Sequence, residues 1–229
     1  MTQMWPCVFC LTVSLSFSAA AQDRMPKIPP DKLTEAQKRA VEERNSAQKV
    51  VRAEACSDPK MDQAKCTAEY FDVHGPMVPL LRSPEVMVAA NAMDNYLEFR
   101  SILPPDVREF VILIAAREWT QQYVWNSHYA NAIKHGLSLE IINALAEGRR
   151  PSTMSDSEEA AYDFCDELRR NRSVSDPTYA RTLSKFGEQG IIEIVSVYGC
   201  YSYLSMVMNM ARTPLSKNAS APPLPALPR

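Results

Sequence analysis

Helix-start signals recur along the chain and constrain its fold more than any other sequence feature. Thr34 with Gln37, and Ser155 with Glu158, form two capping boxes, each with a hydroxyl three residues before an amide or acid. No stretch of six residues alternates cleanly between apolar and polar side chains, and no Asn-Gly or Asp-Gly pair marks a hairpin turn. Because the 229 residues also include only six glycines, the sequence predicts an all-α fold.

The same signals, with the spacing of apolar residues, locate the individual helices. We expect helices over residues 34–55, 83–100, 138–148, 176–187 and 189–211, with another beginning at Ser155. Residues 110–116 are apolar on every side of a helix, which places that helix at the centre of the core. Residues 189–211 approach the length of a membrane span, but Glu193 lies among them. A core or subunit-interface helix is therefore the better interpretation, and Gly199 could break or kink it.

The N-terminus has the composition of an export signal. Residues 4–17 are uncharged and apolar or small, and an Ala-x-Ala sequence follows that predicts cleavage after Ala21. No lysine or arginine precedes this run, which leaves an uncleaved anchor as the alternative. With residues 1–21 removed as a signal peptide, we expect a periplasmic or secreted protein that has no membrane contact after cleavage.

Cysteine usage agrees with an exported protein. Cys56 and Cys66 bracket a polar loop, so a local disulfide is expected there, with two free surface thiols as the alternative. Cys165 and Cys200 lie among apolar residues of expected helices, where buried and unreactive thiols are the better interpretation.

Composition and motifs exclude several classes of function. The net charge of −2 offers no basic surface for nucleic acid, and 46% hydrophobic residues are typical of a globular domain. The sequence has no nucleophile elbow, phosphate-binding glycine loop or His-Glu-x-x-His helix. With three histidines in the chain, a multi-histidine metal site is not expected, and no cofactor is implied.

His128 is the histidine with the most chemical interest. His135 precedes a glycine at a helix end, where it complements the helix dipole, whereas His128 lies inside a helix. Glu109 lies nineteen residues earlier, roughly 28 Å away on one unbroken helix. The two can meet only if the chain turns between them, near Thr120. They would then form either a tuned acid/base couple or a buried ion pair between two helices.

Several segments, in their order and spacing, resemble the carboxymuconolactone decarboxylase superfamily, which includes the alkylhydroperoxidase D group. The resemblance is carried by residues 108–113, 125–128 and 132–138. It implies a multi-helix orthogonal bundle that assembles into trimers or hexamers. It divides the chain into an N-terminal arm and helix at 22–69, a family-like domain at 70–213, and a Pro-rich tail at 214–229 that we expect to be loosely held.

The peroxidase branch of that superfamily has a Glu, a Cys-x-x-Cys pair and a His four residues after the second Cys. Glu109 and His128 match the Glu and the His, but the two Cys positions fall on Gln121 and Val124. Because a thiol peroxidase needs its thiolate, the resemblance does not carry that activity over. The thiol-free decarboxylase branch fits this chain better.

Two functions remain open from the sequence. In the first, His128 transfers a proton and Glu109 orients it, in a lyase or isomerase acting on a small cyclic or unsaturated carboxylic acid. Arg117 would pair the substrate carboxylate, although a structural ion pair with Glu118 or another neighbour is equally compatible. The expected lining of the pocket is Trp119, Gln121, Tyr123 and Trp125. In the second, the chain is a non-catalytic binding or assembly protein on the same scaffold.

Overall fold

The computed structural model describes residues 23–55, 73–215 and 219–226. Within these residues every extended regular element is a helix, which confirms the expected all-α fold. The helices are η1 (Pro30–Lys32), α1 (Glu35–Ala55), α3 (Met77–Leu80), α4 (Pro84–Phe99), α5 (Pro105–Glu118), α6 (Gln122–Lys134), α7 (Leu139–Ala146), α8 (Asp156–Asn171) and α9 (Asp176–Ala211). The expected signal peptide and the Cys56–Cys66 disulfide lie outside the described residues.

Both predicted capping boxes are present. The Gln37 N–H donates to the Thr34 hydroxyl at 3.3 Å, and the Thr34 N–H donates back to the Gln37 side chain at 3.0 Å. Ser155 and Glu158 make the same reciprocal pair at the start of α8. These bonds satisfy backbone donors that the first turn of a helix otherwise leaves unpaired, so the short polar sequences fix where α1 and α8 begin.

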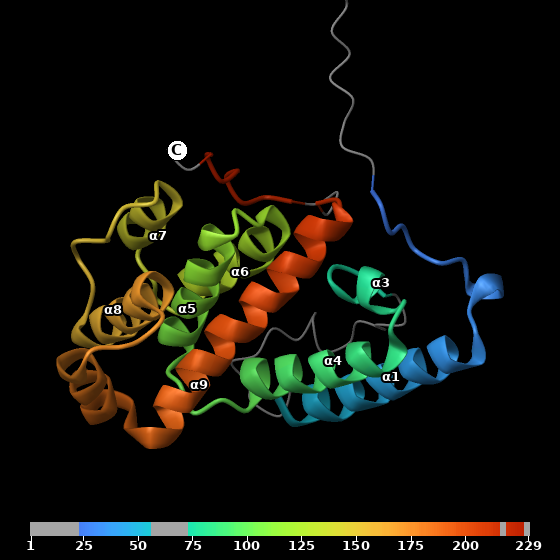
Figure 1. Ribbon diagram of the computed structural model, residues 1–229, viewed down its shortest axis with the longest axis horizontal. Coiled ribbons are helices and arrows are strands. Elements are labelled where there is room, and N and C mark those ends of the chain that lie inside the picture. The colour runs from blue at the N-terminus through green and yellow to red at the C-terminus, as the bar shows by residue number, and fades with distance from the viewer. Residues whose placement is uncertain (1–22, 56–72, 216–218, 227–229) are drawn as a thin grey trace, which may run out of the picture.

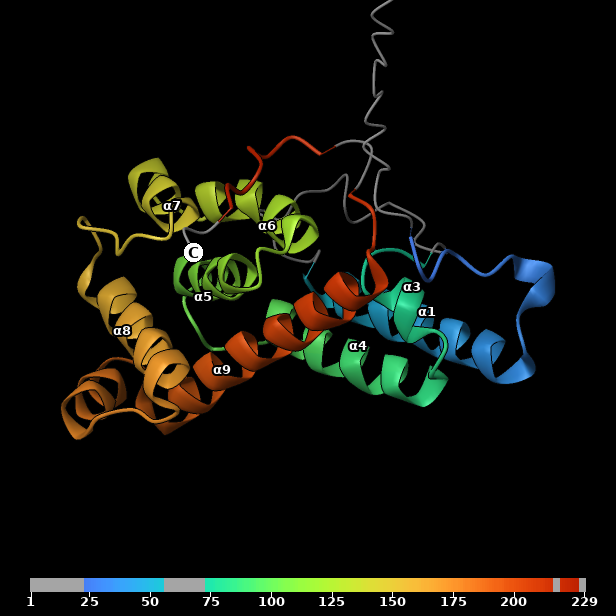
Figure 2. The same cartoon turned by 45° about the horizontal axis from the view of Figure 1, so that its top comes forward.

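Helix α5 lies at the centre of the bundle. It packs against α6, α7, α8 and α9 (Figures 1 and 2), and every residue from 109 to 117 is buried. This confirms the central position expected from its all-round apolar sequence. The same burial also takes two charged residues, Glu109 and Arg117, into the interior.

Helix α9 crosses the molecule diagonally, with α4 and α1 on one side and α5 to α8 on the other (Figures 1 and 2). Gly187, at φ 68° and ψ 179°, kinks it where the sequence predicted a helix end, and Gly199 is regular helix. Among the described helices, α9 alone is long and apolar enough for a membrane span. Half of its most apolar window is buried within the bundle, as in a core helix.

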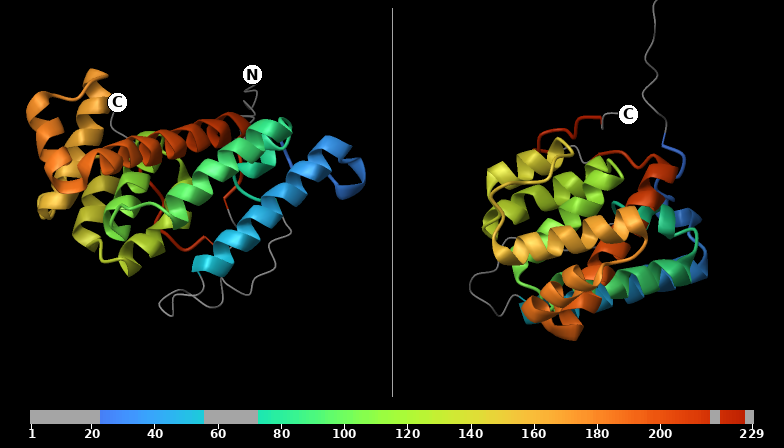
Figure 3. Two further views of the ribbon diagram at one scale, coloured as in Figure 1. Left: turned by 90° about the horizontal axis from the view of Figure 1, so that it is seen from below. Right: turned by 60° about the vertical axis from the view of Figure 1, so that its left-hand side comes forward.

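Helix α1 packs along α4 (Figure 3), which shows how part of the N-terminal segment at 22–69 is used. Ala40 and Arg44 of α1 are both buried, the latter at 2% exposure. Helix α1 therefore covers α4 and is a packed part of the bundle. It brings a cation inside the bundle, where only compensating groups make burial tolerable.

The expectation of a loosely held tail is wrong for residues 219–226. The N–H groups of Ser220 and Ala221 donate to the Asn126 side-chain oxygen at 2.9 and 3.0 Å. The Leu224 N–H donates to the Gln122 oxygen at 2.7 Å. Proline has no N–H to donate, but three of the other amides of this segment find acceptors on α6, and these bonds hold the segment against the bundle.

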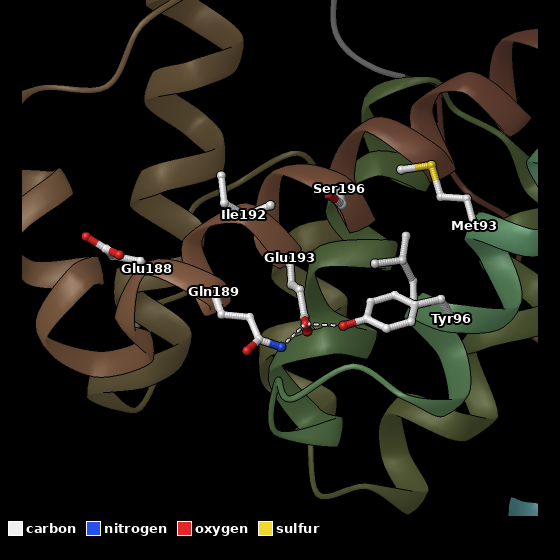
Figure 4. A pocket seen from close by; sticks show the side chains of 8 residues that line it. Met93, Tyr96, Glu188, Gln189, Ile192, Glu193 and Ser196 are labelled. Atoms are coloured by element: carbon white, nitrogen blue, oxygen red, sulfur yellow. Dashed lines mark hydrogen bonds between the residues drawn. The ribbon is translucent and has the colours of Figure 1, made fainter.

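A cavity of about 460 Å³ opens between α4 and α9 (Figure 4). The Glu193 carboxylate on its wall accepts hydrogen bonds from Tyr96, Ser101 and Gln189 and from the Ile102 N–H, at 2.6–2.8 Å. Burial works to raise the pKa of Glu193, but these hydrogen bonds lower it overall. The carboxylate is thus fully engaged in joining α9 to the end of α4.

Replacing this carboxylate should weaken the fold. Glu193→Ala leaves the Ser101 hydroxyl and the Ile102 N–H without their acceptor, so we expect urea unfolding to give a free energy lower by about 1–3 kcal/mol. Glu188→Ala, at an exposed acid in the same cavity, is the matched control and should be neutral. Equal stability of the two variants would contradict this role for Glu193.

Candidate functional site

A tight turn brings the two residues singled out by the sequence together. Helix α5 ends at Glu118, Thr120 adopts a left-handed φ of 46°, and α6 begins at Gln122. A positive φ is unusual for a β-branched residue, so this turn needs support from its neighbours. The chain therefore reverses at Thr120, where the sequence required a turn although neither glycine nor proline marks it.

Gln121 and Asn209 provide that support. The Gln121 side-chain oxygen accepts the Tyr123 N–H at 2.6 Å and so caps α6, while its amide nitrogen donates to Asn209 at 2.9 Å. Asn209 in turn donates to the Trp119 carbonyl at 2.8 Å. Gln121, which was expected to line the pocket, is thus placed where it caps the helix and fixes the turn against α9.

The turn allows His128 and Glu109 to meet inside the bundle. His128 Nδ1 lies 2.9 Å from Glu109 Oε2, and the two residues are 8% and 2% exposed. Arg108 Nη2 lies 3.9 Å from the other carboxylate oxygen. Because Nδ1 faces the carboxylate, Nε2 is the ring nitrogen left for other chemistry.

The surroundings of His128 favour its charged form. Burial alone lowers the pKa of His128, but the charge and hydrogen bond of Glu109 raise it, as do the charges of Glu98 and Asp94, and the net effect is upward. His128 is therefore more basic than an ordinary histidine and can act as a proton donor near neutral pH.

Two residues that sequence reasoning missed complete this group. The ring of Tyr201 contacts the His128 ring edge-on, with centroids 4.9 Å apart, and a hydrogen bond links Tyr201 to Asp94. Burial, with Glu98, raises the pKa of Asp94 to about 6, although His128, Tyr201 and Arg44 act in the opposite direction. The pKa values of Asp94 and His128 are thus both raised and each group acts on the other, as is common for groups that transfer protons.

A polar stripe on α4 was the available signal for this part of the site. Asn91, Asp94, Asn95 and Glu98 follow helical spacing on one face of α4, and Asn91 and Asn95 are buried. Asn91 Oδ1, Asp94 Oδ1 and Asn95 Nδ2 are shielded from solvent and have no partner among the described residues. Because native proteins pair nearly all such atoms, the stripe presents buried polar atoms suited to a polar ligand.

The aromatic residues expected to line a pocket are used in packing. Trp125 is 1% exposed and packs against Tyr129, with centroids 6.3 Å apart. Tyr123 lies against Gly75, where an added Cβ would come within 2.7 Å of the ring, so only glycine fits there. The structure thus brings His128 and Glu109 together, whereas Trp125 and Tyr123 pack against Tyr129 and Gly75.

Arg117 lies away from this group. It is eight residues after Glu109 on α5, about 12 Å along the helix axis, and its Nη1 donates to the Pro225 carbonyl at 2.8 Å. Among the described residues Arg117 makes no ion pair with Glu118, which accepts a hydrogen bond from Tyr198. Arg44 is the buried cation whose charge reaches Asp94.

The two described thiols behave as predicted. Cys165 and Cys200 are free and buried. Burial raises the pKa of both thiols, to about 12 for Cys200, so neither forms a thiolate at neutral pH. Among the described residues, no group of three or more potential ligands is placed to bind a metal ion.

No family model matches the sequence, and no curated protein is significantly similar to it. One matching solved structure is a protein of unknown function from Agrobacterium tumefaciens, provisionally described as an antioxidant defence protein AhpD. It aligns with a TM-score of 0.52 and 18% identity, over 60% of this chain and 94% of its own. The chain has an AhpD-like fold. An identity this low shows the fold alone, so function must be argued from the site.

The raised pKa of His128 can be measured directly. In histidine-ring NMR we expect His128 to titrate above 6.5 and His135, whose pKa is lowered by burial, to titrate below it. Glu109→Gln should lower the His128 value, because the variant removes the carboxylate charge. Glu140→Gln, at an exposed acid on α7, should leave it unchanged. An unshifted His128 in Glu109→Gln would refute the assignment.

Proposed function

We propose that this protein is an exported, carboxymuconolactone decarboxylase-like enzyme that needs no thiol. Its reaction is a decarboxylation or isomerisation of a small cyclic or unsaturated carboxylic acid, by acid/base chemistry. The observation that supports it best is the buried Glu109–His128 hydrogen bond, which orients a ring that also contacts Tyr201 and leaves Nε2 unengaged by the carboxylate. The AhpD-like fold supports the general family, and the chemistry is argued from these residues.

The residues suggest a concrete order of events for decarboxylation. The bond between the substrate carbon and its carboxylate breaks, CO₂ leaves, and the electron pair moves into the adjoining unsaturated system. His128 Nε2 then gives its proton to that carbon, and water restores the proton to the ring. Glu109 stabilises the charged ring before transfer and holds it in place throughout.

Arg44 is a better candidate than Arg117 for the substrate carboxylate. It is buried where α1 packs against α4, and its charge reaches Asp94. Asp94, with a pKa of about 6, can exchange a proton with a second substrate oxygen. In this arrangement the N-terminal helix α1 belongs to the site, although it lies outside the sequence resemblance.

The alternative is a non-catalytic binding or assembly protein. This alternative is favoured by the residues at the two positions where the resembling family has cysteines. There, Gln121 caps α6 and Val124 is a buried apolar residue. In that case the Glu109–His128 pair only joins α5 to α6. A thiol peroxidase is not supported, because both described thiols are buried and their pKa values are raised.

His128→Ala separates the enzyme from the scaffold. If the protein is an enzyme, ultraviolet-monitored turnover of 4-carboxymuconolactone by the purified protein should fall at least about 100-fold, because the proton donor is lost. The exposed His135→Ala is the matched control and should retain turnover. If the protein is only a scaffold, the wild type shows no turnover and His128→Ala loses about 1–3 kcal/mol of stability.

We also propose that copies of the chain assemble through the outer faces of α4 and α9. Around the cavity in Figure 4, Met93, Tyr96 and Ile192 are exposed by 42%, 42% and 65%, and Val195 continues the strip along α9. An exposed apolar surface of this kind is typical of subunit contacts. The family resemblance suggests a trimer or hexamer.

Ile192→Glu tests this assembly. Placing a charge in the centre of the apolar strip should shift sedimentation towards the monomer, because burying an unpaired carboxylate is costly. Leu139→Glu, at a residue 52% exposed on α7, is the matched control and should leave the mass unchanged. The proposal fails if the wild type is already monomeric, or if the Ile192 variant keeps the wild-type mass.

A further inference from the structure

Arg117 is a buried cation without a charged partner. Only 3% of the residue is exposed, and it takes part in none of the ion pairs among the described residues. Burial lowers the pKa of Arg117, and no nearby carboxylate opposes that effect. A charge held inside a protein without a counter-ion is costly, so the fold retains here a group suited to receive an anion.

The unused atoms of Arg117 form a specific binding edge. Nη1 donates to the Pro225 carbonyl at 2.8 Å, whereas Nε and Nη2 are shielded from solvent and have no partner among the described residues. In a guanidinium group, Nε–H and Nη2–H point in parallel from the same edge. That edge matches the two oxygens of a carboxylate, which is the most specific pairing that arginine makes.

Other donors around the α5–α6 turn are also unused. Within the described part of the chain, Gln122 Nε2 and Trp119 Nε1 are buried and have no partner, and neither can accept a hydrogen bond. Gln122 and Arg117 hold adjacent tail residues, since Gln122 Oε1 accepts the Leu224 N–H and Arg117 donates to Pro225. The region under the tail thus offers unused donors and one positive charge.

We propose that the α5–α6 turn and the tail at 219–226 enclose a second binding site, which takes a small carboxylate on the Nε–Nη2 edge of Arg117. The site is separate from the Glu109–His128 pair, about 12 Å away along α5. A carboxylate fits better than phosphate, because one negative charge neutralises one guanidinium and a dianion would leave excess charge buried. The tail acts as a strap that lifts for entry and closes over the bound anion.

The indole N–H of Trp119 provides a direct readout in the unmodified protein. In a ¹H–¹⁵N NMR titration of the purified full chain with sodium acetate, we expect the Trp119 signal, assigned with Trp119→Phe, to shift and saturate. The Trp125 signal should stay in place, because that residue is packed in the core on α6. Acetamide has the same shape without the charge and should produce no saturable shift.

Variants identify the binding group. Arg117→Met should weaken acetate binding at least about tenfold, and Arg117→Lys should weaken it too, because lysine keeps the charge but lacks the paired edge. Arg82→Met is the matched control, since Arg82 also donates to backbone carbonyls but is exposed. It should bind acetate as the wild type does, and so should His128→Ala.

If the Arg117 variants do not fold, hydrogen exchange of the wild-type protein still tests whether the tail closes over a bound anion. Acetate should slow exchange of the Ala221 and Leu224 amides, because the strap closes on the bound anion. An unresponsive Trp119 signal, or an equal response to acetamide, overturns the proposal. So does acetate binding that survives in Arg117→Met but disappears in His128→Ala, since the anion would then belong to the Glu109–His128 site.

Discussion

Helix α5 buries two charged side chains, and the rest of the structure depends on which groups compensate each charge. Glu109, near its start, receives the His128 ring as a partner of opposite charge. Arg117, near its end, receives one backbone carbonyl and no anion. Burying a charge is tolerable only with compensation. The charge near the start of α5 is therefore paired within the protein, whereas the charge near its end is available for the proposed anion.

Helix α9 supplies the supports that make this arrangement stable. Along its length, Glu193 holds the end of α4 by hydrogen bonds, Tyr201 contacts the His128 ring, and Asn209 fixes the turn at Gln121. These three contacts lie on one continuous helix beyond the kink at Gly187. The position of His128 is consequently set by a rigid element, as an acid/base site requires.

The local parts of this structure could be predicted because their causes are local. Capping boxes and the buried α5 sequence follow from neighbouring residues and helix geometry. The turn near Thr120 was expected only as a condition for Glu109 and His128 to meet, because its support comes from Asn209 on the distant helix α9. Arg44 and Tyr201 could not be placed in the site, because their positions depend on how α1 and α9 pack across α4. The tail was misjudged for a similar reason: its acceptors, Asn126 and Gln122, are distant in sequence.

The titration of the site gives the fold a particular response to pH. The pKa of Asp94, about 6 in the folded state, lies above its ordinary value of 3.8, so stability falls as pH rises through that interval. His128 acts in the same direction, because its raised pKa contributes stability that is lost as pH rises above 6.5. Glu193, with a lowered pKa, acts in the opposite direction and loses its contribution in acid. Asp94 and His128 thus make the folded state most stable in mildly acidic conditions, whereas the loss of the Glu193 contribution in acid sets the lower pH limit of that range. A variant that removes Asp94 would abolish the loss of stability between pH 3.8 and about 6 but would also remove a carboxyl that the proposed function uses, so stability and the proposed function oppose each other at this position.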